Sequence, residues 1–348
     1  MAASTRIPVP VCEVTLGAQR WTGQLLTVEI ALASAPLVGV ATVRLPPAAA
    51  VSAVPSDSAT VTIDGADVMR GTVTAVRRGL HAITVTVLDA AGALARSRPA
   101  TTYEKTDAGT VIRALAGDAG VPTGDVADGV GLAWYAADPS RTALEHVARL
   151  AAWSGATAYA DAGGSLVATV IGATEPQTAL RYGREVLSHT QVARSSEVEA
   201  FTVAGEAGAG DGGVPEALRP TSDFFAGNRP AGPDGVHRWG FAPALRTTTA
   251  AATAGAAARR RYVAGRDTAR LTAWLQPSLR PGSVIQIADL PDPPLPDPPG
   301  GGPYWLDRVT HRISARGAVT TARLVRGGPA LDPLAAAAGA AAGLLTGM

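Results

Sequence analysis

Five histidines are the residues of this chain best suited to acid–base or metal chemistry, so their spacing is tested first. The sequence holds no HxxxH pair and no HExxH motif, which would place two imidazoles on one helical face. A zinc hydrolase is therefore disfavoured, and His146 and His311 are interpreted as hydrogen-bonded structural residues. The five histidines are His81, His146, His189, His237 and His311.

Glycine-rich and nucleophile motifs point to no enzyme class either. Gly208 to Gly213 fit GxGxxG, but Pro215 and Pro220 leave no room for the helix that a dinucleotide site needs. Lys105 is the single lysine and lies outside any GxxxxGK[ST] pattern, and GxSxG is absent. We expect a plain loop at 208–213 and no bound cofactor.

The remaining candidate groups are one thiol and a set of acids in a glycine-rich stretch. Cys12 is the only cysteine, which excludes a disulfide within the chain and any multi-cysteine metal site, and we expect it buried and inert. The acids are interpreted as solvated loop residues and not as metal ligands or glycosidase carboxylates: Asp211, Glu216, Asp223 and Asp234. We predict no catalytic, cofactor-binding or metal-binding residue.

Charge and hydropathy exclude further classes. The formal net charge is +1, which is unlike a nucleic-acid-binding protein. Five clustered arginines either line an anionic partner or channel, or form the solvated face of an alanine-rich helix, and we favour the second interpretation: Arg259, Arg260, Arg261, Arg266 and Arg270. No signal peptide or bilayer-length apolar run is found, so we expect cytoplasmic assembly without stable membrane insertion.

The elements that must position these residues form three regions and a tail. Residues 1–98 carry six short Val-, Ile- and Thr-rich segments, which predict a first tube-like β-barrel domain. Residues 99–183 predict a small α+β insert, with a helix after Thr106 and Asp107, a second after Asp138-Pro139-Ser140, and a hairpin. The expected fold class is α+β, mainly β.

The β pattern returns after the insert. Residues 184–330 predict a second tube-like β-barrel domain, with a helix over about 248–262 and long loops at 206–236 and 291–303. Residues 331–348 form an Ala/Gly-rich tail that either docks on another chain or frays. The strands ATVTID, MRGTVTAVRR and HAITVTVLD match SVIQIADL, YWLDRVTHRI and AVTTARLVR, an approximate internal repeat.

Several blocks in order resemble one family of tail proteins. TVTIDGADVMRGTVTAVRR, TTYEKTDAGTVIRALAGDAGV, SRTALEHVARLAAWSGATAYADAGGSLVATV, LRPGSVIQI and YWLDRVTHRISARGAVTTARLVR are similar to the phage late control D and contractile-tail baseplate hub family. The blocks span residues 58 to 328. The loops at 206–236 and 291–303 depart from the family pattern as insertions, and the spike of VgrG-type hubs does not follow residue 328.

The resemblance implies a structural protein. It implies a homotrimer of six similar β units that joins a six-fold inner tube protein to a three-fold, separate spike protein, with baseplate wedge proteins as further partners. It implies a phage tail-like or injection particle, and no enzyme activity. Two alternatives stay open: a carbohydrate- or effector-binding module of such a particle, and a cell-wall hydrolase that uses the acidic loop and the histidines.

Overall fold

A computed structural model describes residues 10–170, 176–192, 198–205, 236–266, 268–290 and 303–326. The first β unit is built from strands in which every second residue is buried, as Val, Ile and Thr alternation predicts. Its strands run antiparallel in the order β3-β4-β7-β6-β5-β1-β2 around one apolar core. They are β1 (Cys12–Leu16), β2 (Gln19–Trp21), β3 (Thr27–Ala33), β4 (Val40–Leu45), β5 (Ser58–Ile63), β6 (Ala66–Arg78) and β7 (Ile83–Asp89).

The second β unit lies about two hundred residues further along the chain and has its own core, which includes Leu271, Ile285, Leu306 and Leu324. Its strands follow the order β14-β17-β20-β19-β18-β13. They are β13 (Thr178–Arg181), β14 (Val186–Val192), β17 (Thr268–Trp274), β18 (Val284–Ala288), β19 (Tyr304–Ser314) and β20 (Gly317–Arg326).

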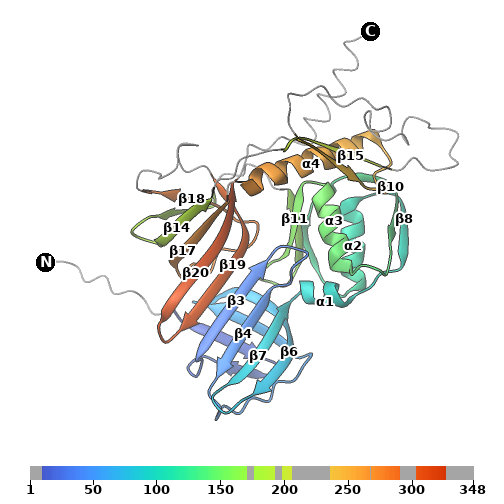
Figure 1. Cartoon of the computed structure of the whole chain (residues 1–348). Coiled ribbons are helices and arrows are strands. Elements are labelled where there is room, and N and C mark those ends of the chain that lie inside the picture. Colours follow the sequence, from blue (N-terminus) through green and yellow to red (C-terminus); the bar gives the residue numbers. More distant parts are fainter. Residues whose placement is uncertain are drawn as a thin grey trace, which may run out of the picture.

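The two β units form one continuous sheet of 13 strands, because β3 of the first pairs antiparallel with β19 of the second. Figure 1 shows this junction where the blue and the red strands lie side by side. The predicted class, α+β and mainly β, is confirmed. The sequence pattern did not predict that the two β regions would be joined edge to edge.

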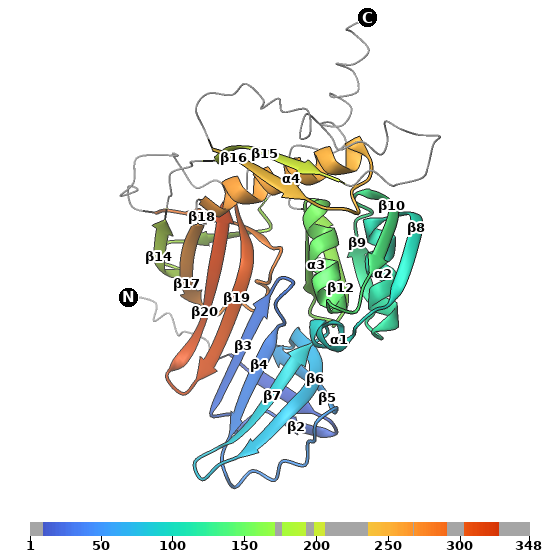
Figure 2. The ribbon, with the colours of Figure 1, turned by 45° about the vertical axis from the view of Figure 1, so that its right-hand side comes forward.

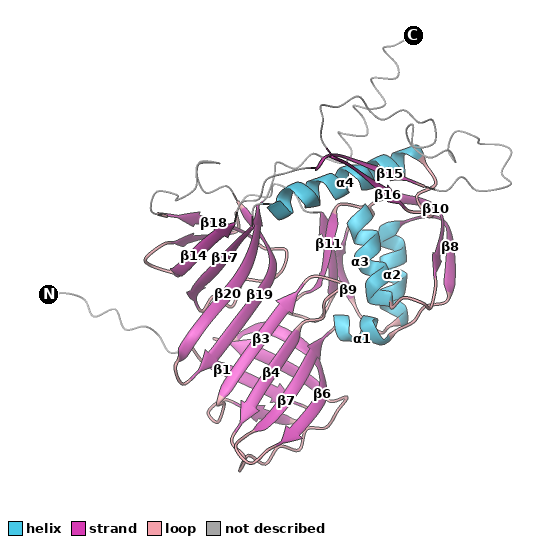
Figure 3. Ribbon diagram, in the orientation of Figure 1, coloured by secondary structure: helices cyan, strands magenta, loops and turns pink. Residues whose placement is uncertain are grey.

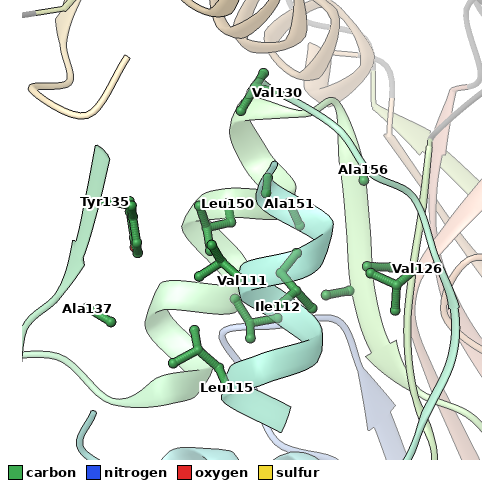
Figure 4. Close-up of a cluster of buried hydrophobic side chains, with 14 of the residues drawn as sticks. Val111, Ile112, Leu115, Val126, Val130, Tyr135, Ala137, Leu150, Ala151 and Ala156 are labelled. Atoms are coloured by element: carbon green, nitrogen blue, oxygen red, sulfur yellow. The ribbon is translucent and has the colours of Figure 1, made fainter. Parts of the chain in front are cut away.

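The insert is a compact α+β body that packs beside the sheet. Figure 4 shows its core, where Val111, Ile112 and Leu115 of one helix meet Leu150 of another. These positions recur at three- and four-residue spacing, so each helix buries one stripe. The elements are α1 (Ala91–Arg96), β8 (Thr101–Asp107), α2 (Ala108–Asp118), β9 (Thr123–Val126), β10 (Gly131–Ala137), α3 (Ala143–Trp153), β11 (Ala156–Ala160) and β12 (Leu166–Val170).

The helix starts agree with the sequence in one case and differ in the other. Asp107 caps α2 as predicted, with its side chain accepting from the Thr110 amide at 2.7 Å. The predicted start of α3 at Asp138-Pro139-Ser140 is wrong by a few residues. Thr142 caps α3 instead, because the Thr-x-x-Glu spacing to Glu145 forms a reciprocal capping box.

A third layer covers one end of the molecule. The long helix α4 (Thr248–Arg266) reaches from the second β unit to the insert, and the views in Figures 1 and 2 agree on this. The parallel pair β15 (Val198–Ala204) and β16 (Val236–Phe241) packs on α4, with Phe201 and Tyr262 ring centroids 5.2 Å apart. Figure 3 shows that helices are confined to the insert and this layer.

Strand pairing refines the limits expected for the insert. β13 pairs with β18 of the second β unit, although it lies within the range 99–183. Helix α1 lies before residue 99, yet Ala91 and Leu94 belong to the insert core. The loops 206–235 and 291–302 and the tail 327–348 lie outside the described residues.

Candidate functional site: the edges of a duplicated sheet

The two β units have the same strand order, which confirms the internal repeat seen in the sequence. Each unit contains three consecutive strands that pair antiparallel in chain order: β5, β6 and β7 in the first unit correspond to β18, β19 and β20 in the second. The neighbouring strands also correspond: β4 to β17 and β3 to β14. The chain therefore contains one sheet motif twice.

The match extends to an irregularity. The β6–β7 register shifts between Val73 and Ala75, and the β19–β20 register shifts between Leu306 and Arg308. Thr74 and Asp307 thus stand at the same bulge of the two β units. The outermost strands differ, because β1 runs antiparallel to β5 whereas β13 runs parallel to β18.

The junction between the β units shows how one copy of the motif joins another. Seven residue pairs connect β19 to β3, from Arg308 opposite Ala33 to Ser314 opposite Thr27. Arg312 stands opposite Glu29, an opposite-charge pair of the kind that stabilises sheets. His311 and Ile30 face each other at the centre and both are fully buried. The β3–β19 junction, in which both edge strands come from the same chain, is therefore well packed.

Two corresponding edges remain after this junction is made. Within the described part of the chain, β14 pairs with β17 and, apart from a bridge from Val186 to Tyr182, with nothing else, and β6 beyond Thr72 pairs with β7 alone. Exposed apolar side chains lie on β14 and at the end of β6: Leu187 and Val192 on β14 are 42% and 44% exposed, and Leu80 in the turn after β6 is 91% exposed. Long edges with exposed apolar residues are templates for pairing with another chain.

The buried histidines are structural, with both ring nitrogens hydrogen-bonded. The His146 Nδ1 lies 2.6 Å from the Tyr135 hydroxyl, and its Nε2 lies 3.0 Å from the Asp138 carbonyl oxygen. The Leu279 carbonyl accepts from Nε2 of His311 at 3.1 Å, and the Thr320 hydroxyl donates to its Nδ1 at 2.9 Å. Burial lowers the pKa of His311 to about 4, so this imidazole is neutral.

The other histidines do not meet a catalytic partner in the described residues. His81 is exposed in the β6–β7 turn, and His189 on β14 packs against the Tyr304 ring with centroids 6.0 Å apart. Burial lowers the pKa of His189. His237 falls in β16, and nothing is described of its side chain. No group of three possible metal ligands occurs among the residues that the structure describes.

Two further titratable groups are buried in the first β unit. Burial raises the pKa of the Cys12 thiol to about 11, which suits an unreactive core residue. Asp89 ends β7 and accepts backbone amides of Gly39 and Ala91, each at 3.0 Å. Burial outweighs these bonds and raises the Asp89 pKa to about 7. A Cβ at Gly39 would lie 2.2 Å from Asp89 Oδ2, so only glycine leaves room for this carboxyl group.

The clustered arginines do not share one environment. Arg259, Arg260 and Arg261 line a cleft between α4, the insert and the second β unit. Arg270 lies exposed on β17, and Arg266 ends α4. The acids Asp211, Glu216, Asp223 and Asp234 and the glycines 208–213 lie outside the described residues.

Several solved structures have a similar fold, although their sequences are remote. A tail protein of Neisseria meningitidis MC58 shares 15% identity over 92% of this chain and 97% of its own, with a TM-score of 0.66. The 43 kDa tail protein of prophage MuSo2 from Shewanella oneidensis shares 16% identity over 91% and 98%, with a TM-score of 0.65.

A third solved structure extends the likeness beyond phages. The E. coli c3393 protein, a type VI secretion component similar to the T4 tail proteins gp27 and gp5, matches with 11% identity and a TM-score of 0.57. That match covers 89% of this chain and 74% of the E. coli chain. No family model and no curated protein sequence matches this chain. Among the described residues, no helix combines the length and apolarity needed to cross a bilayer. The chain therefore shares the fold of phage tail and type VI secretion proteins.

Proposed function

We propose that this chain is a structural, non-enzymatic baseplate hub subunit of a phage tail-like or contractile injection particle. In this proposal three copies form a ring that joins a six-fold inner tube to a three-fold spike carried by a separate chain. Wedge proteins of the baseplate would contact the outside of the ring. The ring would assemble in the cytoplasm and needs neither nucleic acid nor membrane insertion.

The observation that carries the proposal is the β3–β19 junction inside one chain. Two matched β units already stand edge to edge, so three chains supply six units. The same junction repeated between chains would pair β14 of one copy with β6 of the next. Through the matched registers, Arg78 would stand opposite Gln191 of the neighbour, as His311 stands opposite Ile30 within the chain.

The strand geometry offers a selective way to test this contact. The Trp274 amide donates to the Glu185 carbonyl at 2.8 Å, so alternate amides of β17 face β14. Thr272 and Arg270, two and four residues away, pair with Ser188 and Thr190 of β14. The amide of Gln191, next to Thr190, therefore faces the outer edge. Proline at 191 would remove an outward donor and leave the pairing with β17 intact.

Native mass spectrometry of the purified chain tests the proposal. We expect a trimer for the wild type and a monomer for Gln191→Pro, with unchanged circular dichroism and a melting temperature lowered only by the loss of association. Gln191→Ala, which keeps the outward amide, serves as the matched control and should stay trimeric. A wild type that is monomeric at every concentration, or a Gln191→Pro variant that still forms the wild-type ring, contradicts the proposal.

A further inference from the structure

A large cleft lies where the insert, helix α4 and the second β unit meet. Its volume is about 1310 Å³, and its lining comes from α3, β11, α4, β19 and β20. Figures 1 and 2 show these elements converging below α4. Pockets for small molecules measure about 300–1,000 Å³. The cleft is therefore large enough for a segment of polypeptide.

The walls of the cleft are mostly short apolar side chains. Alanines from three elements line it, among them Ala148, Ala156 and Ala257, and Phe201 and Trp305 add aromatic surface. Short side chains leave the volume open and give no row of aromatic platforms on which successive bases could stack. An occupant that packs against these walls must present apolar groups of its own.

The charges of the cleft are unbalanced. Six arginines line it, and Asp307 is the single acidic residue among the described lining residues. Asp307 already accepts from Arg323 Nη1 at 3.0 Å. Among the described lining residues, Arg149 on α3 and Arg259 and Arg261 on α4 add positive charge beyond the Arg323–Asp307 pair.

Arg261 is a partly buried cation in this cleft. Its guanidinium group donates to the backbone carbonyl of Ala156, which carries no charge. Burial lowers the pKa of Arg261 to about 10, and the neighbouring Arg260 acts in the same direction. Asp307 opposes this lowering, but its carboxylate also binds Arg323, so a further anion beside Arg261 would be favourable.

Gly155 makes room for a second guanidinium group. Its φ of +68° lies in the left-handed region, where it ends α3. A Cβ at this position would lie 2.8 Å from Arg260 Nη2. The turn after α3 therefore allows Arg260 to reach the wall of the cleft.

We propose that this cleft binds an acidic peptide segment of a partner protein. Carboxylates of the segment would pair with guanidinium groups of α3 and α4, and its apolar side chains would pack on the alanine walls. Arginine is suited to this task because its planar fork binds a carboxylate through two parallel bonds. The site goes beyond the proposed hub role and does not depend on ring formation.

Fluorescence anisotropy with a defined probe tests the charge requirement. The probe is a short fluorescein-labelled peptide that repeats Glu-Ala-Leu, compared with the same peptide in which every Glu is Gln. We expect the wild-type chain to bind the Glu peptide at least about tenfold more tightly than the Gln peptide. We also expect this preference to weaken as salt is raised. Equal binding of both peptides, or no binding of the Glu peptide, overturns the proposal.

Matched variants locate the site. Arg149→Glu with Arg259→Glu reverses two lining charges, whereas Arg44→Glu with Arg316→Glu reverses two exposed charges on the β units. We expect the first pair to weaken Glu-peptide binding at least about tenfold and the second to leave it unchanged. Equal affinity of the two double variants overturns the proposal. An oligothymidylate probe that binds more tightly than the Glu peptide overturns it in favour of a nucleic-acid site.

Folding of the variants is checked separately. Arg149 lies over the Trp153 ring at 4.7 Å, so its replacement costs a cation–π contact and a small part of the stability. If the double variant does not fold, the single variant Arg259→Glu still tests whether the lining charge is needed for binding. Arg259 is exposed and glutamate is a good helix former, so this variant should fold. This single variant should still weaken Glu-peptide binding, and wild-type affinity in it counts against the proposal.

Discussion

The two β units carry the same sheet motif in different surroundings. In the first unit, β6 ends at Arg78, beyond the bulge at Thr74. Arg78 is exposed and donates to the Val51 carbonyl at 2.7 Å. The matching residue of the second unit is His311, which is fully buried at the junction with β3. Within the single chain, Arg78 lies on an open edge and keeps an exposed charge, whereas His311 at the junction is neutral and has both ring nitrogens hydrogen-bonded. The difference in burial between Arg78 and His311 therefore follows from strand pairing, because β19 pairs with β3 at His311 whereas, among the described residues, β6 pairs only with β7 at Arg78.

The largest effect should follow from placing a charge in either core. Ile63 and Val309 are both fully buried, one in each β unit. We expect Ile63→Asp and Val309→Asp each to cost more than about 4 kcal/mol, because the new carboxylate has no buried partner. Soluble yield and urea unfolding measure this. Ile63→Val and Val309→Ala are the matched apolar controls and should fold with a smaller loss.

The same pair of variants tests whether the β units unfold together. Val309 stands opposite Leu32 across the junction, whereas Ile63 pairs with Cys12 and Ala66 inside the first unit. We expect Val309→Asp to unfold both units. Native-like hydrogen-exchange protection in either unit of that variant would show that the junction does not couple them.

The pH dependence of stability should reflect the burial of His311, whose counterpart in the first β unit is the exposed Arg78. The His311 pKa is about 4 in the folded chain and about 6.5 when unfolded. Between these values the unfolded chain binds a proton at this histidine that the folded chain does not, so the His311 contribution to stability falls as pH falls from 6.5 to 4. The loss should reach about 3 kcal/mol and level off below pH 4. Asp89, whose pKa is raised to about 7, contributes in the opposite direction, so the His311 part is read from the difference between the wild type and His311→Gln.

Urea unfolding at a series of pH values measures this slope. His311→Gln should lose the His311 part of the slope, with lower stability at neutral pH because the bonds to Leu279 and Thr320 are disturbed. Arg78→His is the matched control, since it puts a histidine at the corresponding exposed position and should add no slope. An unchanged slope in His311→Gln would show that other groups cause the acid sensitivity.

Local signals made the insert helices and the repeat predictable. The stripe Val111, Ile112 and Leu115 and the cap Asp107 lie within one short segment, so sequence neighbours decide the structure. The strand β8 was missed because its burial does not alternate and most of its residues are solvent-exposed.

The junction and the cleft depend on contacts between distant segments. β3 and β19 are almost 280 residues apart, and alternation along a strand does not say which edge it will meet. The lining arginines come from α3, α4 and β20, and the sequence around each one predicts only a solvated surface residue. Only the packing of α4 across the insert and the second β unit brings them together.

The smallest effect should follow from exchanging the residues at the matched bulges. Thr74 of the first unit corresponds to Asp307 of the second, where Arg323 binds the carboxylate. Asp307→Thr should cost no more than about 1 kcal/mol, because the ion pair is partly exposed and weakened by solvent. Thermal melting measures this, with Asp67→Thr, which breaks the exposed pair with Arg70, as the control. The same Asp307→Thr variant should bind the Glu peptide more tightly, because it removes the one acid among the described lining residues and releases Arg323. A large loss of stability would mean that the bulge of the second unit depends on its ion pair, unlike the bulge of the first.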